Sequence, residues 1–171
     1  MVLLWDVTDE AAKVEIKADA RLTQQLATMK EKEGDYFLSV IDAEKGSELG
    51  KLLIETGKGS FRVSFILVAG DSVIVTDTQN RVLVYSLKTG VQKGRVFGRY
   101  ATAAHGSNLL CVENETGKVA VYDMETMEKK DEFVFSSRIS MLQMSEDGNR
   151  LFVLTSDQTA QVLDLSGLVK K

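Results

Sequence analysis

The chain has 171 residues, of which 44% are hydrophobic and 27% charged, and its formal net charge is −4 at pH 7. This composition is typical of a globular protein with a buried core and excludes a disordered or collagen-like chain. No stretch reaches the ~18 consecutive apolar residues of a membrane-spanning helix, and the apolar N-terminus lacks the basic region of a signal peptide. We therefore expect no membrane partner, no nucleic-acid partner, and a cytoplasmic location if the chain is complete.

A short pattern recurs along the chain, in which alternating apolar residues lead to an aromatic or aliphatic residue, then to an Asp or Ser, and then to a turn. The last residues of the five copies are Asp6, Asp42, Ser86, Asp123 and Asp164. Successive copies are 36, 44, 37 and 41 residues apart. A spacing of about 40 residues predicts structural repeats.

A second pattern, Arg followed by an apolar residue and then Ser or Thr, has a similar spacing. It begins at Arg21, Arg62 and Arg138, with a weaker copy at Arg99. We interpret these arginines as equivalent residues of successive repeats, which bridge neighbouring repeats or line the rim of a central channel. The predicted units are strand fragments of a preceding repeat in residues 1–20 and four repeats in residues 21–61, 62–98, 99–137 and 138–167.

Residues 8–59 allow two interpretations. Leu22, Leu26 and Met29 have the spacing of one face of a helix, whereas Arg21 begins a copy of the second pattern. Because the repeat gives an independent reason, we expect strands in this region. A short helix inserted in an early repeat is the alternative.

Residues 62–87 and 138–165 align, and each reads as a strand, a turn with Gly, a strand, a turn with Asp, and a third strand. Further strands are expected around Val96 and Phe133. Four antiparallel strands in about 40 residues predict an all-β chain built from propeller blades. The chain contains no proline, which fits closely paired strands because proline removes a backbone hydrogen-bond donor.

The chain resembles the WD40-like β-propeller repeat family, and also the NHL- or YVTN-type repeats. Trp5-Asp6, Tyr122-Asp123 and Leu163-Asp164 stand where WD40 repeats place Trp-Asp, and residues 75–85 are similar to an NHL or YVTN repeat. The resemblance covers residues 60–167 well and residues 1–59 poorly. The Gly-His dipeptide of WD40 repeats is missing, since His105-Gly106 reverses it, so the His–Asp network of that family is not expected.

The resemblance implies a rigid platform whose loops bind partners, with residues that serve the repeat itself. These repeat residues are Trp5, Asp6, Asp42, Tyr85, Tyr122, Asp123, Asp164, Arg21, Arg62 and Arg138.

One segment has the composition of a binding surface, because no acidic residue lies between Asp77 and Glu113. This basic segment contains Arg81, Lys88, Lys93, Arg95 and Arg99, with Phe97 and Tyr100 interleaved. Basic and aromatic side chains together can contact phosphate or RNA. The alternative, which we favour, is a solvated face with charges that protect a sheet edge.

Other chemistry-bearing residues favour structural roles. Cys111 lies in an apolar run, and no base is adjacent, since the single histidine, His105, is six residues away. The glycines of 57–60 and of 94–98 do not lead into a helix, as a phosphate loop would require. Asp77 and Asn80 supply too few oxygens for calcium. We expect no catalytic residue, no cofactor and no metal.

About four repeats are few for a closed propeller. The chain is therefore expected to be part of a larger propeller or half of a ring completed by a second copy, with compact four-bladed closure as a third possibility. The predicted function is a non-enzymatic protein-interaction scaffold. The alternatives are a ligand-binding or enzymatic propeller of the pyrroloquinoline-quinone type and a half-propeller that closes by homodimerisation.

Overall fold

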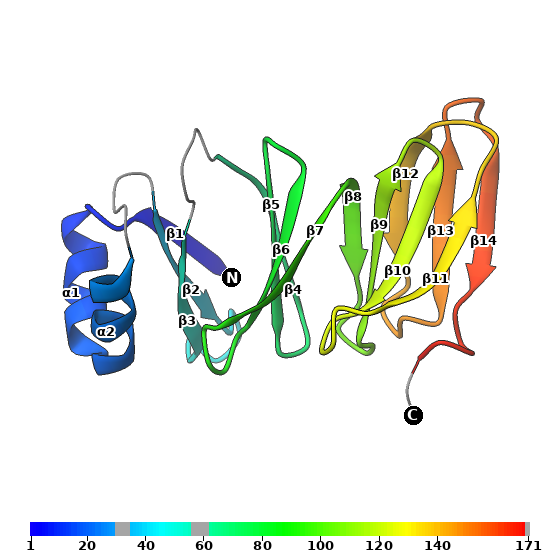
Figure 1. The fold of residues 1–171 in the computed structure, drawn as a ribbon. Coiled ribbons are helices and arrows are strands. Elements are labelled where there is room, and N and C mark those ends of the chain that lie inside the picture. The colour runs from blue at the N-terminus through cyan, green and yellow to red at the C-terminus, as the bar shows by residue number, and fades with distance from the viewer. Residues whose placement is uncertain (30–34, 56–61, 170–171) are drawn as a thin grey trace. The chain divides into compact units, whose positions relative to one another are not determined.

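The computed structural model describes residues 1–29, 35–55 and 62–169. The described chain forms antiparallel sheets of three or four strands, together with two helices that follow the first strand (Figure 1). The elements in chain order are β1 (Val2–Asp6), α1 (Glu10–Ala18), α2 (Ala20–Thr28), β2 (Tyr36–Ile41), β3 (Glu48–Ile54), β4 (Val63–Ala69), β5 (Ser72–Asp77), β6 (Arg81–Ser86), β7 (Gln92–Phe97), β8 (Arg99–Ala103), β9 (Leu109–Glu115), β10 (Lys118–Asp123), β11 (Lys129–Val134), β12 (Ile139–Met144), β13 (Arg150–Thr155) and β14 (Ala160–Asp164).

Four sheets result from this order, and each is a meander of strands that follow one another in the chain. Sheet A contains β1, β2 and β3; sheet B, β4 to β7; sheet C, β8 to β11; and sheet D, β12 to β14. This is the predicted all-β architecture of propeller blades. Sheets A and D have three described strands each instead of the expected four.

The chain divides into two compact units, residues 1–62 with 86–91 and residues 63–85 with 92–171. In the first unit, α1 and α2 cover one face of sheet A. Apolar residues four positions apart, such as Ala12 and Ile16, form the buried stripe of these helices, which packs with Phe37 and Leu53 of the sheet. Neither helix, among the described residues, is long and apolar enough to cross a membrane.

The helices correct the expectation of strands in residues 8–59 for residues 10–28, whereas β2 and β3 in the same range are strands as expected. Arg21, taken as a strand residue of the second pattern, lies in the first turn of α2, where the Asp19 carboxylate accepts hydrogen bonds from the backbone N–H groups of Arg21 and Leu22 at 2.9 and 3.3 Å. An aspartate at this position caps a helix. The cap and the helical spacing of the apolar residues therefore explain why this segment is a helix and not a strand. The alternative of an inserted helix was correct.

The structure also differs from the expected strand fragments of a preceding repeat in residues 1–20. β1 pairs antiparallel with β2, with Leu4 opposite Leu38, and therefore belongs to the same sheet as the strands that follow. Residues 10–18 of this segment form α1.

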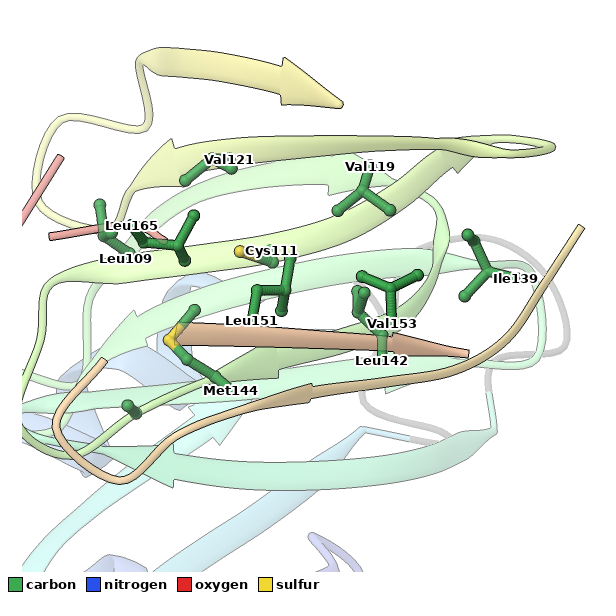
Figure 2. Packing of buried hydrophobic residues seen from close by; sticks show 11 residues of the cluster. Leu109, Cys111, Val119, Val121, Ile139, Leu142, Met144, Leu151, Val153 and Leu165 are labelled. Carbon is green, nitrogen blue, oxygen red and sulfur yellow. The ribbon is translucent and has the colours of Figure 1, made fainter. Parts of the chain in front are cut away.

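In the second unit, sheets B, C and D pack face to face. Ile74, Val82 and Val84 of sheet B are fully buried in a cluster with Leu110 and Val112 of sheet C. Sheets C and D share a second cluster, and Figure 2 shows its members from both sheets directed toward one another. Fully burying one such aliphatic side chain stabilises the fold by about 1.5–3 kcal/mol.

The first strand of each sheet in the second unit contains one extra residue near its start. In sheet B, Val63 pairs with Asp77 and Phe65 with Thr76, so that Ser64 has no partner. Ser140 of β12 is left out in the same way between Ile139 and Met141. In sheet C, residues 100 and 101 lie opposite the single residue 112. Such a β-bulge bends the strand and redirects side chains.

This register explains one sequence pattern and corrects another. The Ser of the Arg–apolar–Ser pattern is the extra residue in sheets B and D. Arg99, by contrast, pairs with Glu113 at the position where Val63 pairs with Asp77. It is therefore equivalent to Val63 and not to Arg62, and the weaker copy of the pattern at Arg99 is one residue out of register.

Candidate interaction surface

The aspartates of the first sequence pattern close turns. The carboxylate of each accepts a hydrogen bond from the backbone N–H two residues later: Thr8 to Asp6 at 2.8 Å, Glu44 to Asp42 at 2.9 Å, Glu125 to Asp123 at 2.9 Å, and Ser166 to Asp164 at 2.8 Å. This geometry is an Asx turn, which Asp adopts readily. The recurring Asp thus has a local structural use.

The aromatic repeat residues lie at the same strand ends. Trp5 stacks on Phe37 with ring centroids 5.4 Å apart. Tyr85 is buried, and Tyr122 is half-buried against the cluster between sheets B and C.

The three arginines of the second pattern have different surroundings. The Arg21 guanidinium donates to the backbone carbonyl of Lys51 at 2.7 Å. Arg62 and Arg138 directly precede β4 and β12 and are exposed. Arg21 therefore does not share a strand position with Arg62 and Arg138.

The basic segment is largely paired with acidic groups. Arg81 Nε lies 2.6 Å from a carboxylate oxygen of Asp77, and Lys93 Nζ contacts the carboxylate of Glu125 and lies 3.1 Å from Ser72 Oγ. Arg99 also has an acidic partner, Glu113. The absence of acids in this stretch of sequence is thus offset by acids just outside it.

The remaining residues of the basic segment are spread over different elements. Arg95 lies over the ring of Phe97 on β7, with its guanidinium carbon 5.4 Å from the ring centroid. Lys88 lies in the β6–β7 turn, which belongs to the first compact unit. Arg99 and Tyr100 lie on β8, at the start of sheet C, and the Arg99 guanidinium carbon is 5.7 Å from the Tyr100 ring centroid.

A groove of about 400 Å³ lies at the starts of β4 and β8. We call it the inner-strand groove. Its lining residues are Ser64, Phe65, Thr76, Asp77, Asn80, Gly98, Arg99, Tyr100, Ala101 and Leu142. Two aromatic side chains lie on it in exposed positions, Phe65 at 51% and Tyr100 at 43% of their full exposure.

Tyr100 occupies a strained backbone conformation, with φ at +51°. A residue with a Cβ pays roughly 1–3 kcal/mol in such a region, and strain of this kind gathers at functional sites. The strain arises in the β-bulge of β8, which directs this aromatic side chain onto the groove.

Behind the groove, Glu113 joins sheets C and D. Its side chain is fully buried, and its carboxylate accepts from the backbone N–H groups of Gly117 at 3.0 Å and Ile139 at 3.4 Å. The other carboxylate oxygen lies 3.0 Å from Arg99 Nη2. Arg99 is thereby held at the rim, next to Tyr100.

The residues considered for catalysis are separated. Cys111 is fully buried between sheets C and D, and burial raises the pKa of its thiol to about 12, so that it stays protonated near neutral pH. His105 is exposed, and its Nδ1 accepts from the backbone N–H of Gly70 at 3.2 Å. Asp77 accepts from the backbone N–H groups of Gln79 and Arg81, as a turn residue does.

Within the described ranges, no group of three or more His, Cys, Asp or Glu side chains is arranged to hold a metal ion. Gly94 lies in β7, and Gly98 connects β7 to β8, so neither leads into a helix. The glycine-rich stretch 57–60 lies outside the described residues.

Two aspartates in turns of sheet D have lowered pKa values, and we therefore expect the chain to lose stability in acid. Hydrogen bonds from Ser145 and Asn149 lower the pKa of Asp147 to about 2, and those from Thr155, Ser137 and Thr159 lower that of Asp157 to about 2, from an ordinary 3.8. A carboxyl whose pKa is lower in the folded state stabilises the fold above the unfolded pKa, and this contribution is lost as the pH falls through the folded pKa.

We therefore expect the melting temperature to fall between about pH 4 and pH 2, and Asp157→Asn to be less stable than the native chain at pH 6 by a margin that shrinks toward pH 2. Thermal melts of both chains across this range measure the margin. A margin independent of pH would contradict the assignment.

Known structures share this fold. The chain is similar to WD40 propeller proteins: a chain of the mitotic checkpoint complex (TM-score 0.57, 18% identity, 79% of this chain and 42% of that chain), the protein Hsv2 in "KlHsv2 with loop 6CD replaced by a Gly-Ser linker" (0.58, 15%, 75% and 42%), and a chain of "Complex of KlAtg21 with coiled-coil of AgAtg16" (0.59, 12%, 75% and 43%). No protein-family model and no curated protein matches the sequence.

The sheets are therefore blades of a WD40-like β-propeller fold. At these identities the likeness concerns the fold. The chain spans less than half the length of each of these three structures.

Proposed function

We propose that the chain is a non-enzymatic protein-interaction module that holds a partner at the inner-strand groove. The observation that carries the proposal is the pair of exposed aromatic side chains, Phe65 and Tyr100, on one groove with Arg99 at its rim. Tyrosine and arginine are enriched among the residues that dominate binding energy at protein interfaces. Two of the similar structures are titled as complexes, one of them with a coiled coil.

The charges at the groove favour binding over acid–base chemistry. The carboxylate of Asp77 is bonded to Arg81, and the guanidinium of Arg99 is paired with Glu113. Both charged groups therefore have partners within the fold, and the apolar exposed groups at the groove are the aromatic side chains of Phe65 and Tyr100. This arrangement supports the scaffold over a propeller enzyme.

Peptide selection tests the proposal. Peptides selected from a random library on the native chain are expected to lose at least about tenfold in affinity when Tyr100 is replaced by alanine, because truncating a residue that anchors an interface costs about 2 kcal/mol or more. Phe65→Ser should weaken binding similarly. Fluorescence anisotropy measures the dissociation constants.

Val134→Ser is the matched control. Val134 is 71% exposed on β11 and does not line the groove, so this variant should bind the peptides as the native chain does. Equal affinities for Tyr100→Ala and the native chain would overturn the proposal, as would peptides that bind elsewhere and are lost with Val134→Ser.

A further inference from the structure

A second hollow adjoins the inner-strand groove. It has a volume of about 480 Å³ and shares three lining residues with the groove, Asn80, Gly98 and Arg99. The rest of its lining comes from the β5–β6 turn, the end of β7, the end of β9 with the turn after it, and Arg138, which directly precedes β12. We call it the polar hollow. Because the two hollows share residues at the crossing from β7 to β8, one bound segment can lie across both.

The two hollows differ in chemistry. The exposed apolar groups of the inner-strand groove are the rings of Phe65 and Tyr100. The polar hollow is lined mostly by amide, hydroxyl and charged side chains, with one exposed ring, Phe97. A ligand that covers both hollows must therefore present an apolar group and a polar group a short distance apart.

The polar hollow has an excess of positive charge. Its two carboxylates have basic partners, since Glu113 pairs with Arg99 and Glu115 lies 2.6 Å from Lys118 Nζ. Arg138 is exposed, and its guanidinium has no hydrogen-bond or ion-pair partner among the residues that the structure describes. One positive charge in this hollow is thus left without a countercharge.

Two more guanidinium groups lie beside this charge. Arg99 donates to Glu113 through Nη2, and its side chain is 46% exposed, so other N–H groups of its fork remain available to a ligand. The exposed Arg95 lies over the ring of Phe97, and in the described part of the chain no acidic group pairs with it. The free hydrogen-bond donors at the polar hollow are therefore those that an anion needs.

We propose that the polar hollow selects partners with an acidic side chain. The partner segment places an apolar anchor in the inner-strand groove and, a few residues away, an Asp or Glu whose carboxylate Arg138 binds. A guanidinium suits a carboxylate because it can donate two parallel hydrogen bonds. This inference rests on the proposed function and deepens it by naming the chemistry of the partner.

The net charge of the chain makes this local charge decisive. At −4, the chain as a whole repels an acidic partner. Charges farther away than about 8–10 Å are largely screened at physiological salt, so the arginines at the hollow dominate the field that a bound carboxylate meets. An acidic segment is therefore attracted at this site and repelled by the rest of the surface.

Peptide composition gives the first test. Peptides selected from the random library on the native chain should be enriched in Asp and Glu near their apolar anchor, and selection on Arg138→Gln should lose this enrichment. Arg150→Gln is the matched control. It lowers the net charge equally, but Arg150 lines neither hollow, and its carbonyl accepts from Ser145, just past the opposite end of β12.

A double-mutant cycle gives the second test. Replacing the acidic residue of a selected peptide by its amide should weaken binding to the native chain about fivefold, as expected for a favourable exposed ion pair. The same replacement should change binding to Arg138→Gln less than about twofold and binding to Arg150→Gln about fivefold. Such non-additivity reports a direct contact. Fluorescence anisotropy measures the dissociation constants, and thermal melts of the variants should match the native chain because neither guanidinium forms an ion pair in the described residues.

The outcomes separate this inference from the proposed function. Peptides that need Tyr100 but show no enrichment in acidic residues would overturn the inference and leave the groove as the binding site. The same holds if the amide replacement weakens binding to Arg138→Gln as much as to the native chain. Peptides whose binding does not depend on Tyr100 would overturn both.

Discussion

Replacing Gly98 by alanine is expected to destabilise the chain by about 3 kcal/mol or more. Gly98 links β7 to β8 at the crossing from sheet B to sheet C, with φ at +157°. A Cβ there would lie 2.4 Å from Val112 Cγ1 and 2.5 Å from the backbone oxygen of Glu113. The backbone of a central strand cannot move aside easily, so the clash adds to the conformational strain.

Alanine substitutions at two other glycines distinguish the cost of the steric clash from the cost of backbone strain. At Gly46, with φ +64° and nothing within 4 Å of an added Cβ, alanine should cost about 1 kcal/mol from strain alone. At Gly167, where nothing lies within 4 Å either, the change should be close to zero. Urea denaturation of the three variants measures the free energy of unfolding of each and therefore the order of the three losses. If Gly98→Ala unfolded at the same urea concentration as Gly167→Ala, the close packing at the crossing would be refuted.

Replacing Glu113 by alanine is expected to destabilise the chain by about 3 kcal/mol. The substitution removes the acceptor of two backbone N–H groups, Gly117 and Ile139, in a buried site. Each buried donor left without a partner costs about 1–3 kcal/mol. Glu113→Gln keeps an acceptor oxygen of similar reach, so about 1 kcal/mol is expected for the loss of charge alone.

Glu125→Ala is the matched control for Glu113→Ala, because Glu125 also pairs with a basic residue, Lys93, but is 56% exposed in its side chain. An exposed ion pair contributes at most about 1 kcal/mol. Urea denaturation with tryptophan fluorescence or circular dichroism follows both variants. Equal losses for Glu113→Ala and Glu125→Ala would mean that the buried hydrogen bonds do not join sheets C and D.

The blades were predictable because two local rules repeat. Strands such as β5 and β13 are short apolar runs, and the turns that bound them contain Gly or Asp. The recurrence of these short patterns predicts the period of about 40 residues. Strands were preferred over a helix before β2, since a three-residue match at Arg21 outweighed the helical spacing of Leu22 and Leu26. A three-residue match is weak evidence for a strand, whereas the N-cap at Asp19 and the apolar face of the helix both stabilise α2.

The groove could not be predicted from the sequence. Its residues come from four strands of three sheets and from two connections between strands, and Phe65 and Leu142 are ordinary apolar residues of their strands. Arg99 and Tyr100 were singled out, but for a basic surface that ion pairs with Asp77, Glu113 and Glu125 partly neutralise. One signal was present: Glu113 directly follows the apolar run 109–112, and a charge at the end of a buried strand needs a partner.

The extra residue at the start of each first strand has a consequence for engineering. In an uninterrupted strand every substitution is constrained on one face by the core. Ser64, Ser140 and Tyr100 are exposed and stand in the irregular part of the pairing, so their side chains can be exchanged without altering the ladder that follows. The blades thus offer three addressable positions, one per sheet, at which libraries could be built to retarget the scaffold.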